Sequence, residues 1–296
     1  MTGLPPVTVG IPVYNAGPYL ADAIRSIFAQ THADWELIIV DDGSSDDGLA
    51  IARSVSDPRV RVLADGTNRG LAARLNQIVR EASHPLVARM DADDLCAPTR
   101  LERQLRLLAR EPSLQLVGTG TYSMDRHCRL IGAREGAVRA ATGVAEVLRG
   151  RVGIIHASSI FRREWLQRFA YDEEIARSED LELWARAAAA GGLVAASVPD
   201  PLYIYREDGN LSAEKLGGAY ALEKRLIDRH TDGSVRARLM ARNALKRALR
   251  HLAAIPAVRA RLLTRRNPQA PDAAMTRRFD DILATIRDTR VPGLAG

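Results

Sequence analysis

In Leu86-Val87-Ala88-Arg89-Met90-Asp91-Ala92-Asp93-Asp94, a largely apolar run leads straight into three carboxylates. The apolar part is typical of a buried strand, and the acidic part of the loop at its carboxyl end, where open α/β sheets bind ligands. Carboxylates this close repel one another unless a cation lies between them, and Mg²⁺ or Mn²⁺ suits such ligands and shares them with substrate phosphates. The stretch predicts a divalent metal holding a diphosphate; the alternative is a solvated acidic turn.

The composition is that of an ordinary globular chain. Its 296 residues suffice for a sizeable core with one large domain or two, and 46% are hydrophobic and 26% charged. Cys96 and Cys128 belong to no CxxC pair, which argues against a disulfide scaffold or zinc ribbon and favours a reducing compartment. Since the N-terminus lacks a signal-peptide pattern and no apolar run approaches the roughly 20 residues of a membrane span, we expect a cytoplasmic protein.

Strands and helices alternate around the opening stretch. The order is strand 7–13, helix 19–30, strand 35–40, helix 47–55, strand 60–63, a helix from Leu71, and the strand that ends at Asp91. This alternation predicts a parallel, doubly wound sheet with right-handed crossovers. The strand ends at Tyr14, Asp42 and Asp93 would then lie along one rim, so three separate turns form one candidate site.

The remainder of the domain is patterned less strongly. We expect a helix over 98–110, the second half of the domain from Gln115, and closing strands over 193–198 and 202–205. Residues 123–141 carry many charges and little periodicity, and we interpret them as a hairpin or a loop. Ser178 is a good N-cap for the helix that follows it, in whose first turn the macrodipole favours acidic residues.

Three motifs resemble those of the family 2 glycosyltransferases, which have a GT-A-type fold. They are Pro12-Val13-Tyr14-Asn15, Val40-Asp41-Asp42-Gly43-Ser44 and Asp91-Ala92-Asp93-Asp94, and they arrive in order within residues 7–212. The resemblance implies a Rossmann-like, mostly parallel sheet flanked by helices. Residues 1–115 would be the nucleotide-sugar-binding half, 116–215 the acceptor-binding half, and 216–296 a basic helical extension.

The resemblance assigns the donor side to the first two motifs. Asp42 would accept the N3–H of uracil, a role that suits a carboxylate because it only accepts hydrogen bonds. A turn and a helix N-cap would also explain the acidic pair at 41–42. The donor-side residues that we predict are Pro12, Tyr14, Asn15, Asp42, Asn68, Arg69, Asp91 and Arg206.

The resemblance also implies the metal ligands. Asp93 would be the principal ligand, and Asp91 would contact the sugar or ribose and take part in the metal site. Asp94 would cap the helix from Pro98 or support the loop. Tyr205-Arg206-Glu207-Asp208 resembles the family's Tyr-Arg-x-His loop, which directs Arg206 at the pyrophosphate. Asp208 replaces a histidine of many relatives, and we predict it as a further ligand since Asp also binds Mg²⁺ or Mn²⁺.

A second acidic motif, Ser178-Glu179-Asp180, is the predicted source of the residues that act on the acceptor. By resemblance Asp180 is the catalytic base and Glu179 supports it or binds the acceptor. The alternative is that the macrodipole alone explains both acids. His156 and Ser158 are predicted to face the acceptor, and the alternative is a buried polar pair bonded to backbone.

The basic character belongs to the tail. Residues 216–296 hold 17 Lys and Arg against 7 Asp and Glu, a balance of +10, so the total of +6 leaves −4 for residues 1–215. We expect helices over 222–230, 235–255 and 274–287. In the second, the basic face would be Arg238, Arg242, Lys246 and Arg250, and the face that packs would be Ala241, Ala244, Leu245, Ala248 and Leu252. The basic face is either a solvated surface or a peripheral contact with an anionic membrane.

These features predict an inverting, metal-dependent glycosyltransferase with Mg²⁺ or Mn²⁺ as cofactor. It would move a sugar from a UDP-sugar to a hydroxyl of a glycan or lipid-linked acceptor in surface polysaccharide biosynthesis. The alternatives are a sugar-phosphate nucleotidyltransferase, although the first turn lacks its Gly-rich basic loop, and a non-catalytic nucleotide-sugar-binding module. No nucleic-acid partner is expected, since no aromatic platform accompanies the arginines. The sequence leaves open whether the chain forms a homo-oligomer.

Overall fold

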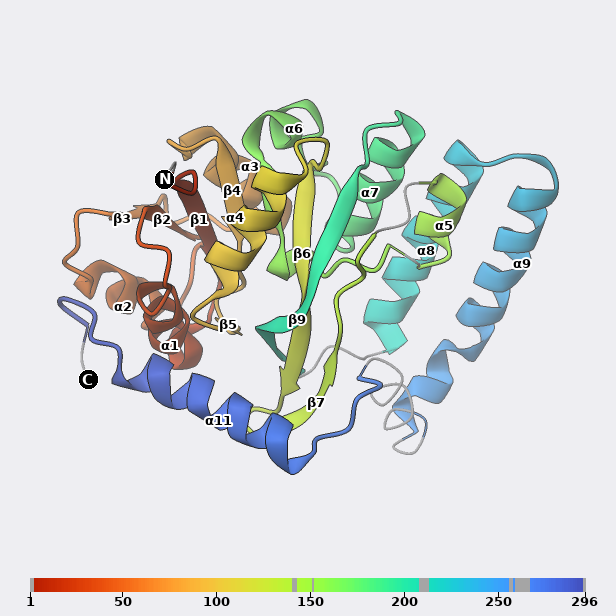
Figure 1. Ribbon diagram of the computed structural model, residues 1–296. Helices are drawn as coiled ribbons and strands as arrows, with labels where there is room; N and C mark the ends of the chain where they lie inside the picture. The colour runs from red at the N-terminus through yellow and green to blue at the C-terminus, as the bar shows by residue number, and fades with distance from the viewer. Residues whose placement is uncertain are drawn as a thin grey trace.

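The computed structural model describes residues 3–139, 143–150, 152–207, 213–255, 258 and 267–294. Within these ranges one sheet of nine strands forms the centre of the molecule, and helices cover both of its faces (Figure 1). The strand order is β3-β2-β1-β4-β8-β6-β9-β5, and β7 pairs with β6.

The first half of the sheet is the parallel, alternating unit that the sequence predicts. Its elements are β1 (Val7–Val13), α1 (Gly17–Phe28), β2 (Trp35–Asp41), α2 (Gly48–Ser54), β3 (Val60–Ala64), α3 (Leu71–Glu81) and β4 (Leu86–Arg89). Strand β1 lies between β2 and β4 and is parallel to both, and β3 is parallel to β2. The carboxyl ends of β1, β2 and β4 therefore lie side by side.

Burial on both faces explains why these strands are nearly continuous apolar runs. In β2, Leu37 and Ile39 pack into a core with α1 and α4, while Ile38 and Val40 point the other way, into a core with α3, α6 and α7. The alternation follows from the two-residue period of a strand.

The second half of the sheet is mixed. Its elements are β5 (Leu95–Cys96), α4 (Arg100–Arg110), β6 (Leu116–Met124), β7 (Leu130–Arg134), α5 (Val144–Leu148), η1 (His156–Ser158), β8 (Ile160–Arg162), α6 (Arg163–Arg168), α7 (Glu179–Ala189) and β9 (Ala195–Arg206). Strand β8 is antiparallel to β4 and β6, whereas β9 is parallel to β6. Strands β6 and β7 form an antiparallel hairpin, which is one of the two interpretations of residues 123–141.

Two predicted boundaries are wrong. Helix α4 begins at Arg100 and not at Pro98. The two closing strands are one strand, β9, because its pairing with β6 continues through a register shift opposite Pro199 and Pro201. A proline cannot donate to a ladder, and an irregularity of this kind accommodates it. Ser178 does occupy the N-cap position of α7, but its backbone is left-handed (φ 60°) and its side chain makes no capping hydrogen bond.

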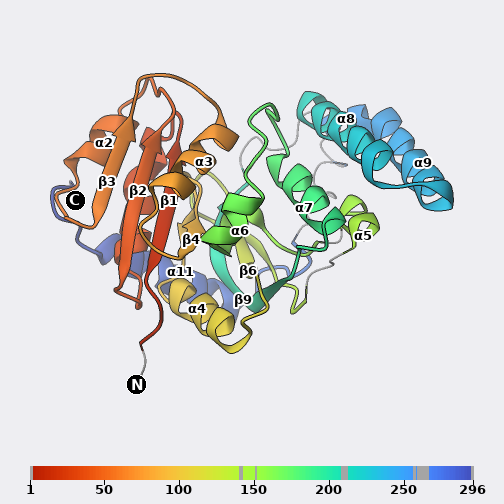
Figure 2. The same cartoon turned by 90° about the horizontal axis from the view of Figure 1, so that it is seen from above.

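The C-terminal region is helical, as expected. Its elements are α8 (Ala213–His230), α9 (Gly233–Leu249), η2 (Arg250–Ala254) and α11 (Ala273–Asp288). Helices α8 and α9 form a pair that projects beyond α7, with α9 outermost in both views (Figures 1 and 2). Helix α11 runs back below the sheet in the view of Figure 1, where Phe279 and Ile286 pack in one cluster with Tyr122 and Met124.

The face of α9 that packs is the opposite of the predicted one. Leu239 and Asn243 are buried against α8, whereas Ala241, Ala244, Leu245, Ala248 and Leu252 are exposed. The reason is that α8 offers polar partners. Asn243 donates to the Tyr220 carbonyl at 2.9 Å, and Lys246 lies 2.7 Å from Glu223. Lys246 of the predicted basic face is therefore directed at α8.

Candidate active site

The acidic loop after β4 is held rigidly by strand β9. The Tyr203 hydroxyl donates to Asp94 at 2.8 Å and accepts from the backbone N–H of Asp91 at 3.1 Å. The backbone N–H of Arg206 donates to the second oxygen of Asp94 at 2.8 Å. Asp94 thus supports the loop, and the helix-cap alternative for it is wrong because Thr99 precedes α4. Asp91 and Asp93 remain as the carboxylates that can serve a ligand.

Electrostatics at this loop favour a cation. Burial first, and then the charge of Asp91, raise the pKa of Asp93. Burial and the charge of Asp93 raise the pKa of Asp94 well above its ordinary value. Asp93 and Asp94 therefore resist ionisation, and a bound cation would relieve the repulsion between the carboxylates of the loop.

Arg89 is a site residue that sequence reasoning missed. It is buried at the end of β4, and its Nη2 lies 2.8 Å from Oδ1 of Asp91. Burial alone would lower the pKa of Arg89, but the carboxylates of Asp91 and Glu179 outweigh burial and raise it. Arg89 therefore stays charged, and it interacts with one carboxylate from each half of the domain, Asp91 and Glu179. Its place in an otherwise apolar strand could have indicated this role, because a buried charge needs a partner of opposite charge.

The first turn of α7 carries the second acidic pair, Glu179 and Asp180, and Glu179 lies near His156 of η1. Burial and then Asp180 raise the pKa of Glu179. Burial also raises the pKa of Asp180, although its Oδ1 accepts the backbone N–H of Leu181 at 2.8 Å. A carboxylate whose pKa is raised is a stronger base, so either acid can take a proton from an acceptor hydroxyl.

His156 belongs to the same cluster. Its Nε2 is hydrogen-bonded to the Tyr171 hydroxyl at 2.7 Å, and its Nδ1 lies 3.7 Å from Glu179. Burial and the charge of Arg89 hold the pKa of His156 well below its ordinary value, so the ring is neutral. Tyr171 was not predicted from the sequence, since nothing in its local pattern indicates the contact.

One cavity of about 620 Å³ joins the two acidic groups. Its walls include Arg89, Asp91, His156, Glu179 and Asp180. Ser158 does not line it: its hydroxyl is fully buried, donates to the Ile155 carbonyl at 2.8 Å and accepts from the Thr119 N–H at 3.1 Å. The alternative of a buried polar group bonded to backbone therefore fits Ser158, while His156 faces the cavity.

The other predicted donor residues lie on the adjacent rim. Asn15, at the end of β1, accepts the Ser45 N–H at 2.8 Å and so ties the first turn to the second. Tyr14 is exposed beside it, and Pro12 pairs with Val40 in the sheet. Asn68 and Arg69 are exposed in the turn before α3.

Asp42 holds that turn in place. Its carboxylate accepts the backbone N–H groups of Arg69 at 2.7 Å and Gly70 at 3.0 Å, and Nε of Arg74 at 2.8 Å. Arg74, another residue that sequence reasoning missed, is buried and also pairs with Asp65. A carboxylate has about four lone-pair positions, so three contacts leave one for a ligand.

Arg206 lies against the acidic loop. Its Nε donates to the Asp93 carbonyl at 2.9 Å, and its guanidinium stacks over the Tyr19 ring at 4.2 Å. Asp208, the predicted further metal ligand, lies outside the described residues. Within the described ranges, no group of three or more His, Cys, Asp or Glu side chains could hold a metal ion. Asp91 and Asp93 thus fit a metal only as the protein's share of a shell that substrate phosphate completes, which is the usual arrangement for Mg²⁺.

This fold and site define a glycosyltransferase of the GT-A type. Residues 8–169 match the sequence profile of Glycosyl transferase family 2, and the chain belongs to that family. Bacillus subtilis EpsE, a protein named as a glycosyltransferase, is 31% identical over 216 residues, which are 71% of this chain and 76% of EpsE. The Escherichia coli protein WfgD is named UDP-Glc:alpha-D-GlcNAc-diphosphoundecaprenol beta-1,3-glucosyltransferase. It is 33% identical over 104 residues, 35% of this chain and 41% of WfgD.

Solved structures show the same fold. Residues 1–349 of Staphylococcus aureus TarS, in complex with UDP, align with a TM-score of 0.62 and 17% identity over 84% of this chain and 73% of that one. The mannosyltransferase PcManGT of Pyrobaculum calidifontis, in complex with GDP-Man and Mn²⁺, aligns with a TM-score of 0.61 and 19% identity over 97% of this chain and 86% of that one. None of the helices in the described ranges is long and apolar enough to cross a bilayer.

Proposed function

We propose that this chain is an inverting glycosyltransferase that moves a sugar from a UDP-sugar to a hydroxyl of a glycan or lipid-linked acceptor in surface polysaccharide biosynthesis. The observation that carries the proposal is one cavity whose walls include Asp91 of the acidic loop, Glu179 and Asp180 of α7, and Arg89, which pairs with Asp91. A nucleotide-sugar lying over the acidic loop would present its anomeric carbon to a hydroxyl held at the start of α7.

Asp180 is the proposed base. As the acceptor hydroxyl attacks the anomeric carbon, its proton passes to a carboxylate within hydrogen-bond reach. The raised pKa of Asp180 suits it for this role, and its Leu181 contact fixes the side chain. Glu179 and His156 complete the acceptor side. One displacement with one base needs no covalent intermediate, and the product then has the opposite anomeric configuration from the donor.

Asp93 and Asp91 would hold the divalent cation, Mg²⁺ or Mn²⁺. When bound, that cation neutralises the diphosphate leaving group as a Lewis acid. Arg206, beside the same loop, would add a fixed positive charge near the diphosphate.

The residues proposed to recognise the nucleobase lie on the rim beside the cavity, at the turns after β1 and β2. We propose that the remaining acceptor position of Asp42 takes the N3–H of uracil, with Pro12, Tyr14 and Asn15 along the base and ribose and Asn68 and Arg69 at the neighbouring turn. The names of two relatives support the donor and the acceptor. TarS was solved with UDP, and the name of WfgD states a UDP-glucose donor, a diphosphoundecaprenol-linked acceptor and a beta linkage.

A donor screen tests the proposal. UDP-, GDP- and dTDP-sugars are incubated with the protein and Mn²⁺ or Mg²⁺, and thermal stabilisation and release of nucleoside diphosphate are measured. We expect one UDP-sugar to stabilise the protein and to release UDP when a glycan acceptor is added. Release of inorganic diphosphate from a sugar phosphate and UTP would instead indicate a nucleotidyltransferase. Binding of UDP-sugars without turnover of any acceptor would indicate a non-catalytic module.

A further inference from the structure

The outer face of α9 and η2 carries an exposed apolar stripe. We use the name α9 stripe for Leu245, Leu249, Leu252 and Ile255, which are 60%, 48%, 43% and 46% exposed. Leu245 and Leu249, four residues apart, share one side of α9, Leu252 lies in η2, and Ile255 directly follows η2. Ala241, Ala244 and Ala248 are exposed beside them. Contiguous apolar surface of this kind commonly marks a place where a protein binds another surface.

The inward face of α9 explains why the stripe is free. Leu239 and Asn243 are buried against α8, and Lys246 is paired with Glu223 of α8. Since this polar interface fixes the rotation of α9, the leucines point away from the protein. Both views show α9 as the outermost helix on its side of the molecule (Figures 1 and 2).

The charge beside the stripe identifies the partner. Residues 233–255 contain six Arg and Lys and neither Asp nor Glu, and Arg238, Arg242 and Arg247 of these are exposed. At 3.6 residues per turn, Arg238 and Arg242 lie on the same side of α9 as Leu245 and Leu249. Leucines with arginines beside them are the pattern of a helix that lies in the interface of a bilayer. The same stretch contains no Trp, Tyr or Phe, so the attachment rests on a few leucines and on charge.

We propose that the α9 stripe and its arginines dock this protein on a bilayer surface that carries anionic lipids. The contact is peripheral, and salt weakens it because exposed charges are screened over about 10 Å at 0.1 M ionic strength. Leu216 and Ala219 of α8, the helix against which α9 packs, line the 620 Å³ cavity. Docking through α9 therefore brings the cavity close to the lipid surface. The proposal does not depend on the identity of the donor or acceptor.

Vesicle sedimentation tests the proposal with the full-length chain. Vesicles of phosphatidylcholine, with or without phosphatidylglycerol, are mixed with the protein at low and high salt, and the bound fraction is measured. We expect binding only to the phosphatidylglycerol vesicles, with loss at high salt. The double variant Arg238→Gln/Arg242→Gln should reduce partitioning roughly 25-fold, about fivefold for each charge lost.

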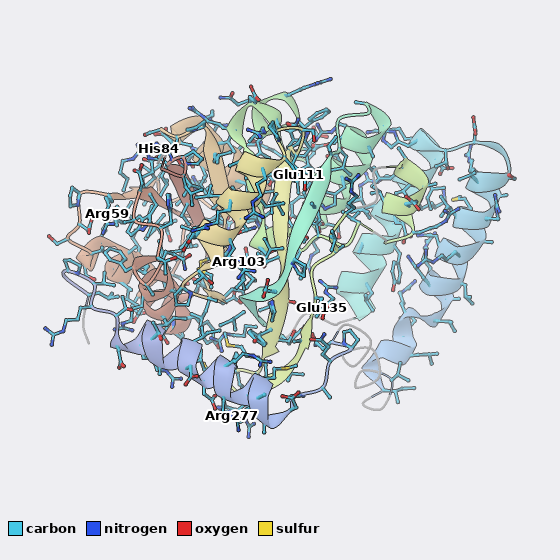
Figure 3. All side chains as sticks on the ribbon, in the orientation of Figure 1. Arg59, His84, Arg103, Glu111, Glu135 and Arg277 are labelled. Atoms are coloured by element: carbon cyan, nitrogen blue, oxygen red, sulfur yellow. The ribbon has the colours of Figure 1, made fainter. Side chains whose placement is uncertain are left out.

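Two further variants distinguish the contribution of the α9 stripe to binding from that of positive charge elsewhere on the protein. Leu245→Gln/Leu249→Gln keeps helix propensity and all charges, and it should reduce partitioning on the order of tenfold or more. Arg277→Gln/Arg278→Gln removes two exposed arginines from α11, a helix under the sheet and apart from α9 (Figure 3), and should bind as the wild type does. Thermal unfolding of each variant verifies that it is folded.

Three results would overturn the docking proposal. The first is failure of the wild type to bind phosphatidylglycerol vesicles at low salt, or equal binding to both kinds of vesicle. The second is wild-type binding by both α9 variants, or equal loss in the α11 variant. The third is a dimer, seen by light scattering, that Leu245→Gln/Leu249→Gln dissociates, because the stripe would then belong to a second copy of the chain.

Discussion

Buried Arg89 forms an ion pair with Asp91, with Nη2 and Oδ1 2.8 Å apart, between the acidic loop after β4 and the first turn of α7. The same guanidinium opposes the rise in the pKa of Glu179 and Asp180. One cation thus pairs with Asp91 and favours the ionised forms of Glu179 and Asp180. Its loss should affect both the proposed base and the proposed metal loop.

Arg89→Met should shift the pH profile of the enzyme. A nearby positive charge lowers a carboxyl pKa by about 1–3 units, so removing it raises the pKa of the base. The base is then protonated at a higher pH, and the acidic limb of kcat/KM moves upward by about one unit or more. Arg89→Lys keeps the charge and should move the limb less. An unchanged limb in Arg89→Met would show that Arg89 does not act on the base.

Asp93→Asn should abolish metal-dependent turnover, because an amide cannot offset the charge of a metal–diphosphate complex. The measurement is UDP release over a titration of Mn²⁺ and Mg²⁺, with the wild type in excess EDTA as reference. Full activity of the variant, or of the wild type in EDTA, is incompatible with the metal assignment.

Asp180→Asn should retain UDP-sugar binding and lose transfer. The amide oxygen can still accept the Leu181 N–H, so the start of α7 is preserved. A general base contributes roughly 10²–10⁴-fold, and kcat should fall by that order. Glu179→Gln is the control at the neighbouring residue, and it should lower kcat less than Asp180→Asn does. If Asp180→Asn keeps near wild-type kcat, Asp180 is not the base, and its carboxylate only interacts favourably with the N-terminus of α7.

Tyr203→Phe should destabilise the acidic loop. Removal of the hydroxyl leaves Asp94 and the Asp91 N–H without a shared partner, and an unsatisfied buried polar group costs about 1–3 kcal/mol. Urea unfolding measures the loss. Tyr122→Phe is the matched control, since the Tyr122 ring packs on Phe279 and away from the loop. Equal stability of both variants would exclude the bracing role of Tyr203.

The parallel half of the fold could be predicted closely from the sequence. Strand β1 has its expected bounds and β2 ends one residue beyond them, because strands buried on both faces are continuous apolar runs between turn residues. The ends of β1, β2 and β4 then had to be neighbours. For the same reason the acidic loop after β4 could be placed beside the turns after β1 and β2 from the order of the residues alone.

The contacts that complete the site could not be predicted in this way. Tyr203 meets Asp94 across 109 residues of chain, and no local pattern encodes such a pair. The α9 periodicity indicated a helix but not which side packs, since Glu223 of α8 attracts Lys246 and turns the leucines outward. The left-handed backbone at Ser178 likewise depends on the loop before α7 and not on its own residue type.

The stereochemistry of the product shows whether the sugar is transferred by a single displacement. With the donor found in the screen, the anomeric proton of the transferred sugar is followed by proton NMR from the first turnovers. A single displacement driven by Asp180 predicts inversion, so an α-linked UDP-sugar gives a β-linked product. A product that retains the α configuration would contradict the account.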